Sequence, residues 1–176
     1  MILKLKRTPG IYVVGFMASG KTTIGRLLAR RLGWDFVDLD DDVEAAAKMS
    51  ISEIFEQRGE PEFRRLETEA LRSRVRAIES GKPTVIALGG GTFVQPENAA
   101  LIADNGVTIW LDCPFTIVKR RVERAAHRPL ARDAALFAQL FEERRQHYAR
   151  AEYRIPIEGE NPEPVVEAVL RLPLFE

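Results

Sequence analysis

Residues 15–22 carry the most specific chemical signal in the chain. Their sequence, Gly-Phe-Met-Ala-Ser-Gly-Lys-Thr, fits the phosphate-binding pattern G-x-x-x-x-G-K-[ST]. Glycine lets the backbone fold so that its N–H groups face a phosphate, and Lys21 can reach the outer phosphates of a nucleotide. The hydroxyl of Thr22 can ligate Mg²⁺, and the following helix adds its positive N-terminal end. The residues of this motif expected to bind a nucleotide are Gly15, Ala18, Ser19, Gly20, Lys21 and Thr22, together with Thr23 directly after it.

Two aspartates belong to the next apolar run. Asp38 and Asp40 are two residues apart in a segment that we expect to be a strand, so both side chains should project to one face. Carboxylates at such a place can hold Mg²⁺, directly or through water, or accept a hydrogen bond from a substrate hydroxyl. The alternative is that the aspartates at 40–42 only cap the following helix, a role that we expect of Asp41 or Asp42.

Three consecutive glycines, Gly89, Gly90 and Gly91, follow another apolar run. Because glycine has no Cβ, a ligand can approach bare backbone there. The alternative is a tight turn from strand to helix. In a chain that also carries a phosphate-binding loop, we favour the binding role.

Charged residues elsewhere give weaker signals. Arg64 and Glu67 are spaced to share one helix face, but their neighbours form ordinary surface pairs, so these residues alone favour a solvated face. Arginines also crowd residues 120–132, and a loop there could swing Arg128 onto a nucleotide. Composition alone does not distinguish such a lid from a solvated basic surface.

The elements that must position these residues alternate along the chain. Apolar runs bounded by glycine or proline predict strands at 11–14, 36–40, 84–88, 107–111 and 154–157, the last an edge strand because of its proline. Helical spacing and capping signals predict helices at 23–32, 50–59, 61–80, 96–105 and 162–170. Two further helices are expected, one that begins at 114 and one that ends at about 148. This alternation predicts a mostly parallel sheet covered on both faces, with ligands at the carboxyl ends of its strands.

Length and composition exclude several classes of protein. The 176 residues are 45% hydrophobic and 30% charged, which predicts one globular domain over residues 1–176. The 26 basic and 26 acidic residues give a formal net charge of +0, so we expect no general affinity for nucleic acid. One cysteine and two histidines are too few for an ordinary zinc site. Without a membrane-spanning run or a signal peptide, the expected location is the cytoplasm, away from membranes.

The phosphate-binding loop can also be assigned to a class of enzyme. A GTP-driven switch would show Asn-Lys-x-Asp and Asp-x-x-Gly, and neither string occurs. A large motor or helicase would need a longer chain than this one. A small phosphotransferase is the class that remains.

The chain resembles shikimate kinase from end to end. The fairly specific part of the resemblance is a Phe-Arg-Arg-x-Glu string combined with three glycines, whereas the phosphate-binding loop is shared by very many enzymes. The matching strings are Gly-Phe-Met-Ala-Ser-Gly-Lys-Thr-Thr-Ile-Gly-Arg (15–26), Asp-Leu-Asp (38–40), Ser-Ile-Ser-Glu-Ile-Phe (50–55), Gly-Glu-Pro-Glu-Phe-Arg-Arg-Leu-Glu (59–67), Leu-Gly-Gly-Gly (88–91), Arg-Pro-Leu (128–130) and Arg-x-x-x-Tyr (144–148).

The resemblance implies a fold and a reaction. The fold would be an α/β P-loop kinase, related to nucleoside monophosphate kinases, with a five-stranded parallel sheet flanked by helices on both faces. A mobile lid would span about 120–133, and substrate-binding helices about 41–80. The reaction would transfer the γ-phosphoryl group of ATP, with Mg²⁺ as cofactor, to the 3-hydroxyl of shikimate, a step toward chorismate and the aromatic amino acids. The expected partners are these small molecules alone, and the expected state is a monomer.

The resemblance also implies roles for residues. Lys21, Asp40 and Arg128 would be catalytic, and Thr22 and Asp38 would hold Mg²⁺, Asp38 through water. ATP would further contact Arg121, Arg128 and Pro162, with Arg121 and the turn at 161–162 flanking the adenine. Shikimate would be bound by Asp40, Arg64, Gly89, Gly90, Gly91 and Arg144.

The sequence departs from the family pattern at a few positions. Ala18 stands where glycine is frequent and Thr22 where serine is frequent, and both keep the chemistry. Residues 146–147, Gln-His, replace the usual Pro-Leu before Tyr148. This change weakens the placement of Arg144, because the adjacent Arg145 could compete for the same role.

Two alternative functions have distinct tests. A kinase for another small acceptor, such as gluconate or a nucleoside monophosphate, would be separated by an ADP-release assay across acceptors. A non-catalytic nucleotide-binding regulator would bind ATP without acceptor-dependent turnover. The combination of Lys21, Thr22, Asp38 and Arg128 argues against the regulator.

Overall fold

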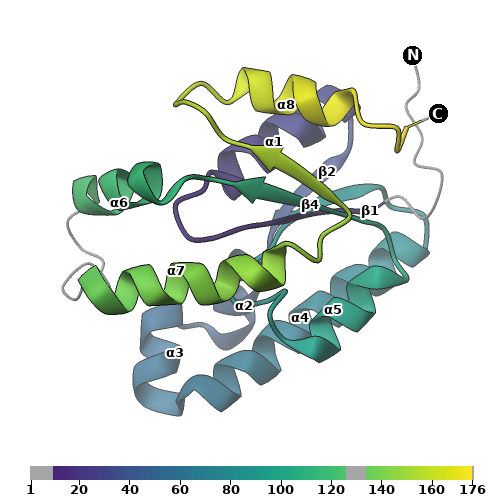
Figure 1. The fold of residues 1–176 in the computed structure, drawn as a ribbon. Helices are drawn as coiled ribbons and strands as arrows, with labels where there is room; N and C mark the ends of the chain where they lie inside the picture. The colour runs from purple at the N-terminus through teal and green to yellow at the C-terminus, as the bar shows by residue number, and fades with distance from the viewer. Residues whose placement is uncertain (1–9, 126–133, 176) are drawn as a thin grey trace.

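A single parallel sheet organises the chain, whose computed structural model describes residues 10–125 and 134–175 (Figure 1). Its strands lie in the order β2-β3-β1-β4-β5, and each neighbouring pair is parallel. Every residue of β1, β3 and β4 is buried, as their continuous apolar sequences predict. The strands are β1 (Gly10–Val14), β2 (Asp35–Asp38), β3 (Thr84–Ala87), β4 (Val107–Asp112) and β5 (Tyr153–Pro156).

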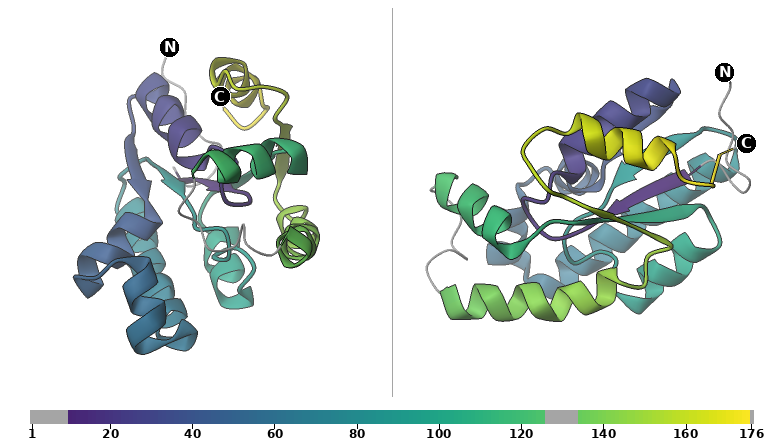
Figure 2. Two further views of the ribbon diagram at one scale, coloured as in Figure 1. Left: turned by 90° about the vertical axis from the view of Figure 1, so that its left-hand side faces the viewer. Right: turned by 45° about the horizontal axis from the view of Figure 1, so that its top comes forward.

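Helices cover both faces of the sheet. Helices α1 and α8 lie on one face and α4, α5 and α7 on the other, as Figures 1 and 2 show from three directions. The arrangement confirms the predicted α/β fold with a five-stranded parallel sheet. The helices are α1 (Lys21–Leu32), α2 (Leu39–Ala47), α3 (Ile51–Arg58), α4 (Glu60–Glu79), α5 (Pro96–Ala103), α6 (Phe115–Arg124), α7 (Ala134–Tyr148) and α8 (Glu163–Leu170).

Helices α2 and α3 pack on α4 beyond the β2 edge through a small core of their own. Val43, Ile54 and Phe63, one from each helix, are buried against one another. A two-pronged ion pair joins α4 to α2, because Nε and Nη2 of Arg74 donate to the two carboxylate oxygens of Asp42 at 2.5 and 2.8 Å. The start of α2 is therefore held firmly against α4.

The prediction for the end of β2 was wrong. The strand ends at Asp38, and α2 begins at Leu39, so Asp40 lies in a first helical turn and not on a strand. Asp38 is the N-cap of α2, since its Oδ1 accepts a hydrogen bond from the backbone N–H of Asp40 at 3.0 Å. The predicted cap at Asp41 or Asp42 was therefore also wrong.

Other sequence predictions correspond closely to the structure. Ser50 and Glu53 form the predicted capping box at the start of α3. Strand β5, with its proline, lies at the edge of the sheet as expected. Within the described part of the chain, no helix combines the length and apolarity needed to cross a membrane.

Candidate active site

Three neighbouring strands bring the sequence motifs to one end of the sheet. Ala87 of β3 is in register with Val13 of β1 on one side and with Asp38 of β2 on the other. The next residue, Leu88, still donates its N–H to the Val13 carbonyl at 3.0 Å. The phosphate-binding loop after β1, the glycine loop after β3 and the aspartates after β2 must therefore lie side by side.

The phosphate-binding loop holds its lysine over its own backbone. Nζ of Lys21 donates to the carbonyl oxygens of Gly15 and Phe16, both at 2.9 Å. Ala18 and Gly20 have positive φ angles of 59° and 97°, which turn the loop toward the start of α1. These contacts fix the ammonium group at the mouth of the loop, where an outer phosphate would meet it.

The left-handed conformation of Ala18 gives a first prediction. An L-residue in this region costs about 1–2 kcal/mol, and glycine avoids most of that cost while losing more chain entropy on folding. We expect Ala18→Gly to leave turnover within about twofold and to change the unfolding free energy by less than about 1 kcal/mol. Steady-state kinetics and thermal melts check this expectation. A large loss of turnover would mean that the methyl group of Ala18 itself contacts the nucleotide.

A cavity of about 370 Å³ lies beside the phosphate-binding loop. One wall carries Arg121, whose Nη1 donates to the Ala18 carbonyl at 2.8 Å. Glu160 pairs with the same guanidinium at 3.2 Å, and the turn of Asn161 and Pro162 also lines the cavity. The residues predicted to flank an adenine ring are thus brought together around a space of suitable size.

A second cavity, of about 260 Å³, lies between the phosphate-binding loop and the glycine loop. Its lining includes the lysine, both aspartates of interest and two of the three glycines, namely Lys21, Thr22, Asp38, Asp40, Gly89 and Gly90. Ala18, Gly20 and Thr23 line both cavities, so the two spaces meet along the phosphate-binding loop. A phosphoryl donor in the first cavity would point its outer phosphate into the second.

The predicted metal ligands lie next to each other. The hydroxyl of Thr22 donates to Oδ2 of Asp38 at 2.7 Å. Hydroxyl and carboxylate oxygens suit Mg²⁺, which usually takes one or two protein oxygens and completes its shell with water and phosphate. The described residues contain no cluster of three or more His, Cys, Asp or Glu side chains suited to a metal.

Asp40 has the most perturbed carboxyl group of the site. Burial, followed by the charges of Asp38 and Glu67, raises the pKa of Asp40 from 3.8 to about 6, against the opposing charge of Lys21. A Cβ at Gly89 would lie 2.9 Å from Oδ1 of Asp40, so only glycine leaves room for this carboxylate at the loop. The carboxyl group can therefore gain or lose its proton close to neutral pH, where an ordinary aspartate is fully ionised.

Arg64 lies against the other end of the glycine loop. A Cβ at Gly91 would fall 2.5 Å from Nη2 of Arg64. Nη1 donates to Oε1 of Glu67 at 2.9 Å, and Glu67 is only 1% exposed. Nε of Arg64 is buried, lies 3.5 Å from Glu60, and has no hydrogen-bond partner among the described residues. The two acidic neighbours therefore hold the guanidinium in place, with its Nη2 toward the glycine loop.

The structure shows which of Arg144 and Arg145 faces the glycine loop, a question that the sequence left open. A Cβ at Gly90 would lie 3.1 Å from Nη1 of Arg144, so this guanidinium faces the glycine loop. Arg145 instead pairs with Asp112 at 3.3 Å and lies over the ring of Trp110, 5.6 Å from its centroid. Arg144 and Arg64 thus approach the same loop from two different helices.

The lid prediction is only partly within the described residues. Residues 120–124, placed in the predicted lid, form the end of α6, and Arg120 and Arg121 both pair with Glu160. Residues 126–133 of the predicted lid, Arg128 among them, lie outside the described residues.

Sequence reasoning assigned no role in the site to three residues that shape it: Thr92, Tyr148 and Glu67, and the solvated face expected for Glu67 was wrong, because this side chain is 1% exposed. Glu67 orients Arg64, Thr92 donates its hydroxyl to Oε2 of Glu67 at 2.7 Å, and Tyr148 donates its hydroxyl to the Gly90 carbonyl. Burial raises the pKa of Tyr148, which keeps this donor protonated. Glu67 and Tyr148 stand within the matched strings and could have been found there, whereas nothing in the sequence singled out Thr92.

Comparisons with known proteins agree with this geometry. A family model described as "Shikimate kinase" matches residues 17–172. The shikimate kinase of Persephonella marina is 39% identical over 161 residues, which are 91% of this chain and 96% of that protein. A structure of shikimate kinase from Acinetobacter baumannii in complex with shikimate has a TM-score of 0.84 and 33% identity, over 93% of this chain and 91% of that one. For shikimate kinase from Aquifex aeolicus the TM-score is 0.81 at 38% identity, over 92% and 94% of the two chains. The resemblance inferred from the motifs is confirmed, and the chain belongs to the shikimate kinase family.

Proposed function

We propose that the protein is a shikimate kinase, which transfers the γ-phosphoryl group of ATP to the 3-hydroxyl of shikimate and releases shikimate 3-phosphate and ADP. The observation that carries the proposal is that two cavities meet along one phosphate-binding loop. Asp40 lines the second cavity, and Arg64 and Arg144 lie against the glycine loop that borders it. The family and its solved structures support the same reaction. The product serves the synthesis of aromatic amino acids.

The proposed roles in the nucleotide half follow from the loop. Backbone N–H groups of the loop and the ammonium of Lys21 bind the outer phosphates, and Arg121 and Pro162 enclose the adenine. Thr22 and Asp38 hold Mg²⁺, which supplies charge neutralisation at the phosphates. Arg128 is proposed as the lid arginine that reaches the moving phosphoryl group when the lid closes.

In the acceptor half, acidic and basic side chains are proposed to bind opposite ends of the shikimate molecule. Asp40 accepts a hydrogen bond from the attacking hydroxyl and orients it, and it takes the proton late, because a loose transition state needs little help from a strong base. Arg64 and Arg144 bind the carboxylate, to which their forked donors are suited. The backbone of the glycine loop lies between these two ends and leaves space for the ring.

The finer parts of the proposal concern setting and partners. We propose that the enzyme works in the cytoplasm as a monomer with small molecules as its only partners. The balance of 26 basic and 26 acidic residues opposes general binding to nucleic acid.

A coupled assay of ADP release tests the reaction directly. Turnover should depend on shikimate and should stay at background with gluconate or a nucleoside monophosphate. The methyl ester of shikimate should be a poor substrate, because it lacks the charge that the arginines bind. Equal turnover of ester and free acid would contradict the proposal that the arginines bind the carboxylate. ATP binding without any acceptor-dependent turnover would indicate a regulator.

The two adjacent arginines of α7 provide a matched pair of variants. Arg144→Ala should raise the KM for shikimate by roughly 10–150-fold, since charged hydrogen bonds contribute about 1.5–3 kcal/mol each. Arg145→Ala should leave this KM within about twofold, because Arg145 pairs with Asp112 away from the glycine loop. The KM for ATP should barely change in either variant. A larger effect at Arg145 would exchange the two assignments.

A further inference from the structure

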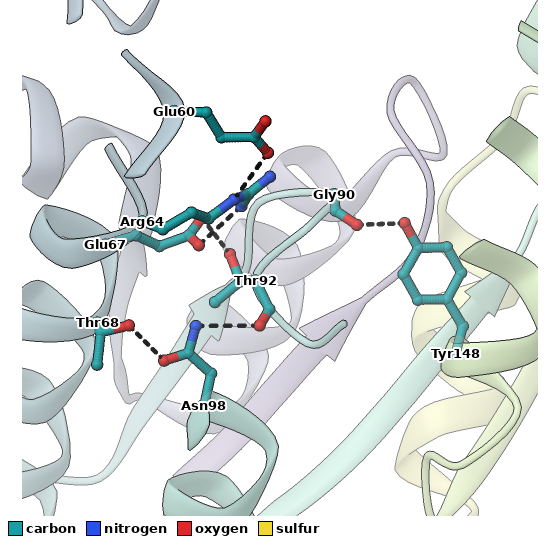
Figure 3. A network of polar contacts seen from close by, with 8 residues as sticks. All are labelled: Glu60, Arg64, Glu67, Thr68, Gly90, Thr92, Asn98 and Tyr148. Carbon is teal, nitrogen blue, oxygen red and sulfur yellow. Dashed lines mark hydrogen bonds and ion pairs between the residues drawn. The ribbon is translucent and has the colours of Figure 1, made fainter. Parts of the chain in front are cut away.

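We infer that a buried chain of hydrogen bonds through Thr68, Asn98 and Thr92 positions Arg64 and the glycine loop for the acceptor, which makes Thr92 a positioning residue of the reaction. The inference rests on the proposed function, because its readout is the binding of shikimate. Figure 3 shows this network between α4, α5 and the loop that follows β3.

Thr92 connects the glycine loop to the carboxylate that holds Arg64. Its hydroxyl donates to Oε2 of Glu67 at 2.7 Å, while Oε1 of Glu67 accepts from Arg64 at 2.9 Å. Its backbone N–H donates to the Gly89 carbonyl at 3.1 Å, which closes the turn of the glycine loop. The same residue therefore fixes both the loop backbone and the carboxylate.

Asn98 fixes Thr92 in turn. Its Nδ2 donates to the Thr92 carbonyl at 3.1 Å, and its Oδ1 accepts from the hydroxyl of Thr68 at 2.8 Å. A carbonyl oxygen can only accept, so the amide of Asn98 has one satisfying orientation. Thr68 follows Glu67 directly on α4, so the bonds form a closed ring from α4 through Asn98 and Thr92 back to α4.

Burial makes this ring rigid. Asn98 and Thr92 are 0% exposed, and Glu67 is 1% exposed. Losing one bond would leave a buried polar group without its partner, which costs more free energy than the bond itself contributes. The alternative arrangements of these side chains are accordingly unfavourable, and Arg64 keeps one direction before substrate arrives.

The ring also bears on Asp40. A Cβ at Gly89 would lie 2.9 Å from Asp40, 3.1 Å from the Thr92 hydroxyl and 3.3 Å from Oε2 of Glu67, so these oxygens converge behind the loop. Thr92→Val removes only the hydroxyl, so its effect on acceptor binding should pass through Glu67 and Arg64.

The decisive experiment is a set of isosteric variants with kinetics and calorimetry. Thr92→Val should raise the KM and the dissociation constant for shikimate by about tenfold, and the KM for ATP should stay within about twofold. Thr92→Ser keeps the hydroxyl and should return both values to within about threefold of the parent. Thr68→Val, a milder change at the far side of the ring, should raise the KM for shikimate by about threefold.

A matched control separates positioning from stability. Thr84 is also buried and donates its hydroxyl to a carbonyl, that of Lys82, but it lies at the opposite end of β3. Thr84→Val should lower the melting temperature about as much as Thr92→Val and leave the KM for shikimate unchanged. An equal rise of this KM in both variants would overturn the inference.

A double-mutant cycle tests whether Thr92 acts through Arg64. In an Arg64→Ala background, Thr92→Val should change the KM for shikimate by less than about twofold, because the residue that it positions is gone. Additive effects would overturn the inference. If the parent protein phosphorylates shikimate and Thr92→Val binds it normally, the inference fails alone; if the parent does not phosphorylate shikimate, the proposed function fails.

Discussion

Replacing Lys21 by methionine is expected to lower kcat by ~10²–10³ in a protein that stays folded. The ammonium group lies over the phosphate-binding loop, 2.9 Å from two of its carbonyl oxygens, and is not part of the hydrophobic core. A fixed positive charge at the transferring group contributes about 3–4 kcal/mol to transition-state stabilisation, and methionine removes the charge with little change in side-chain length. Single-turnover kinetics with saturating ATP and shikimate measure the loss.

A control for this result is Lys82→Met, which makes the same substitution at an exposed position before β3. It should leave kcat within about twofold, since a surface charge remote from the site contributes little to the reaction. Thermal melts of both variants report whether the fold survives. Nearly normal kcat in a well-folded Lys21→Met would remove the phosphate-binding assignment on which the whole site depends.

The fold could be predicted from sequence because its signals are local. Continuous apolar strands ended by glycine, and helices with caps and 3.6-residue spacing, give the order of elements and their parallel arrangement. The order of strands in the sheet is a different matter, since it depends on packing between segments distant in the chain. No strand order was predicted, and only the number of strands came from the resemblance to a family.

The end of β2 shows where local patterns mislead. The apolar run at 36–40 predicted a strand through Asp40, but the strand ends at Asp38 and the helix begins at Leu39. An aspartate that follows a strand can cap a helix as readily as it can extend the strand, and the acidic first turn of α2 favours the cap. The two carboxylates still lie close together, because the capping bond joins Asp38 to the backbone of Asp40.

The supporting residues of the site could not be predicted for a physical reason. Thr92 and Asn98 have ordinary residue types in an unremarked loop and helix, and their role arises from contacts with α4 that span about 25–30 positions in sequence. Likewise, the sequence assigned Arg144 only through the resemblance, with the adjacent Arg145 left in competition. Only the pairing of Arg145 with Asp112 and Trp110 shows which of them faces the glycine loop.

Asp40→Asn is expected to lower kcat/KM for shikimate by ~10²–10³, with the KM for ATP within about twofold. The amide keeps the size of the side chain, but its NH₂ group donates where the attacking hydroxyl needs an acceptor. Asp41→Asn is the matched control, since Asp41 is the next residue of the same helical turn and is exposed. If ATP affinity falls instead and shikimate binding does not, Asp40 belongs to the metal site and the roles of Asp38 and Asp40 are exchanged.

The pH dependence of the parent enzyme follows from the same carboxyl group. Burial and the charges of Asp38 and Glu67 raise the pKa of Asp40 to about 6. In the proposed reaction the ionised form of Asp40 accepts the hydrogen bond of the hydroxyl. The value of kcat/KM for shikimate should therefore fall as the pH drops through about 6. The residual activity of Asp40→Asn should lack this limb, and an unchanged limb would assign it to another group.

As the pH rises through about 6, the stability of the folded protein should fall while its activity rises. Because the folded-state pKa of Asp40 lies above its ordinary value of 3.8, the stability that protonation provides is complete below pH 3.8 and is lost as the pH rises through about 6. At pH 7.5 the ionised carboxylate thus opposes folding, and Asp40→Asn should raise the unfolding free energy by about 1–3 kcal/mol. For a chain of this size that is a rise of roughly 2–8 °C in Tm, measurable by scanning calorimetry. The gain should shrink toward zero below pH 4, where the parent carboxyl is protonated in both states. A variant that loses activity and stability together at pH 7.5 would show that Asp40 supports the fold, and that its loss of activity reports damage to the site and not the absence of an acceptor for the hydroxyl.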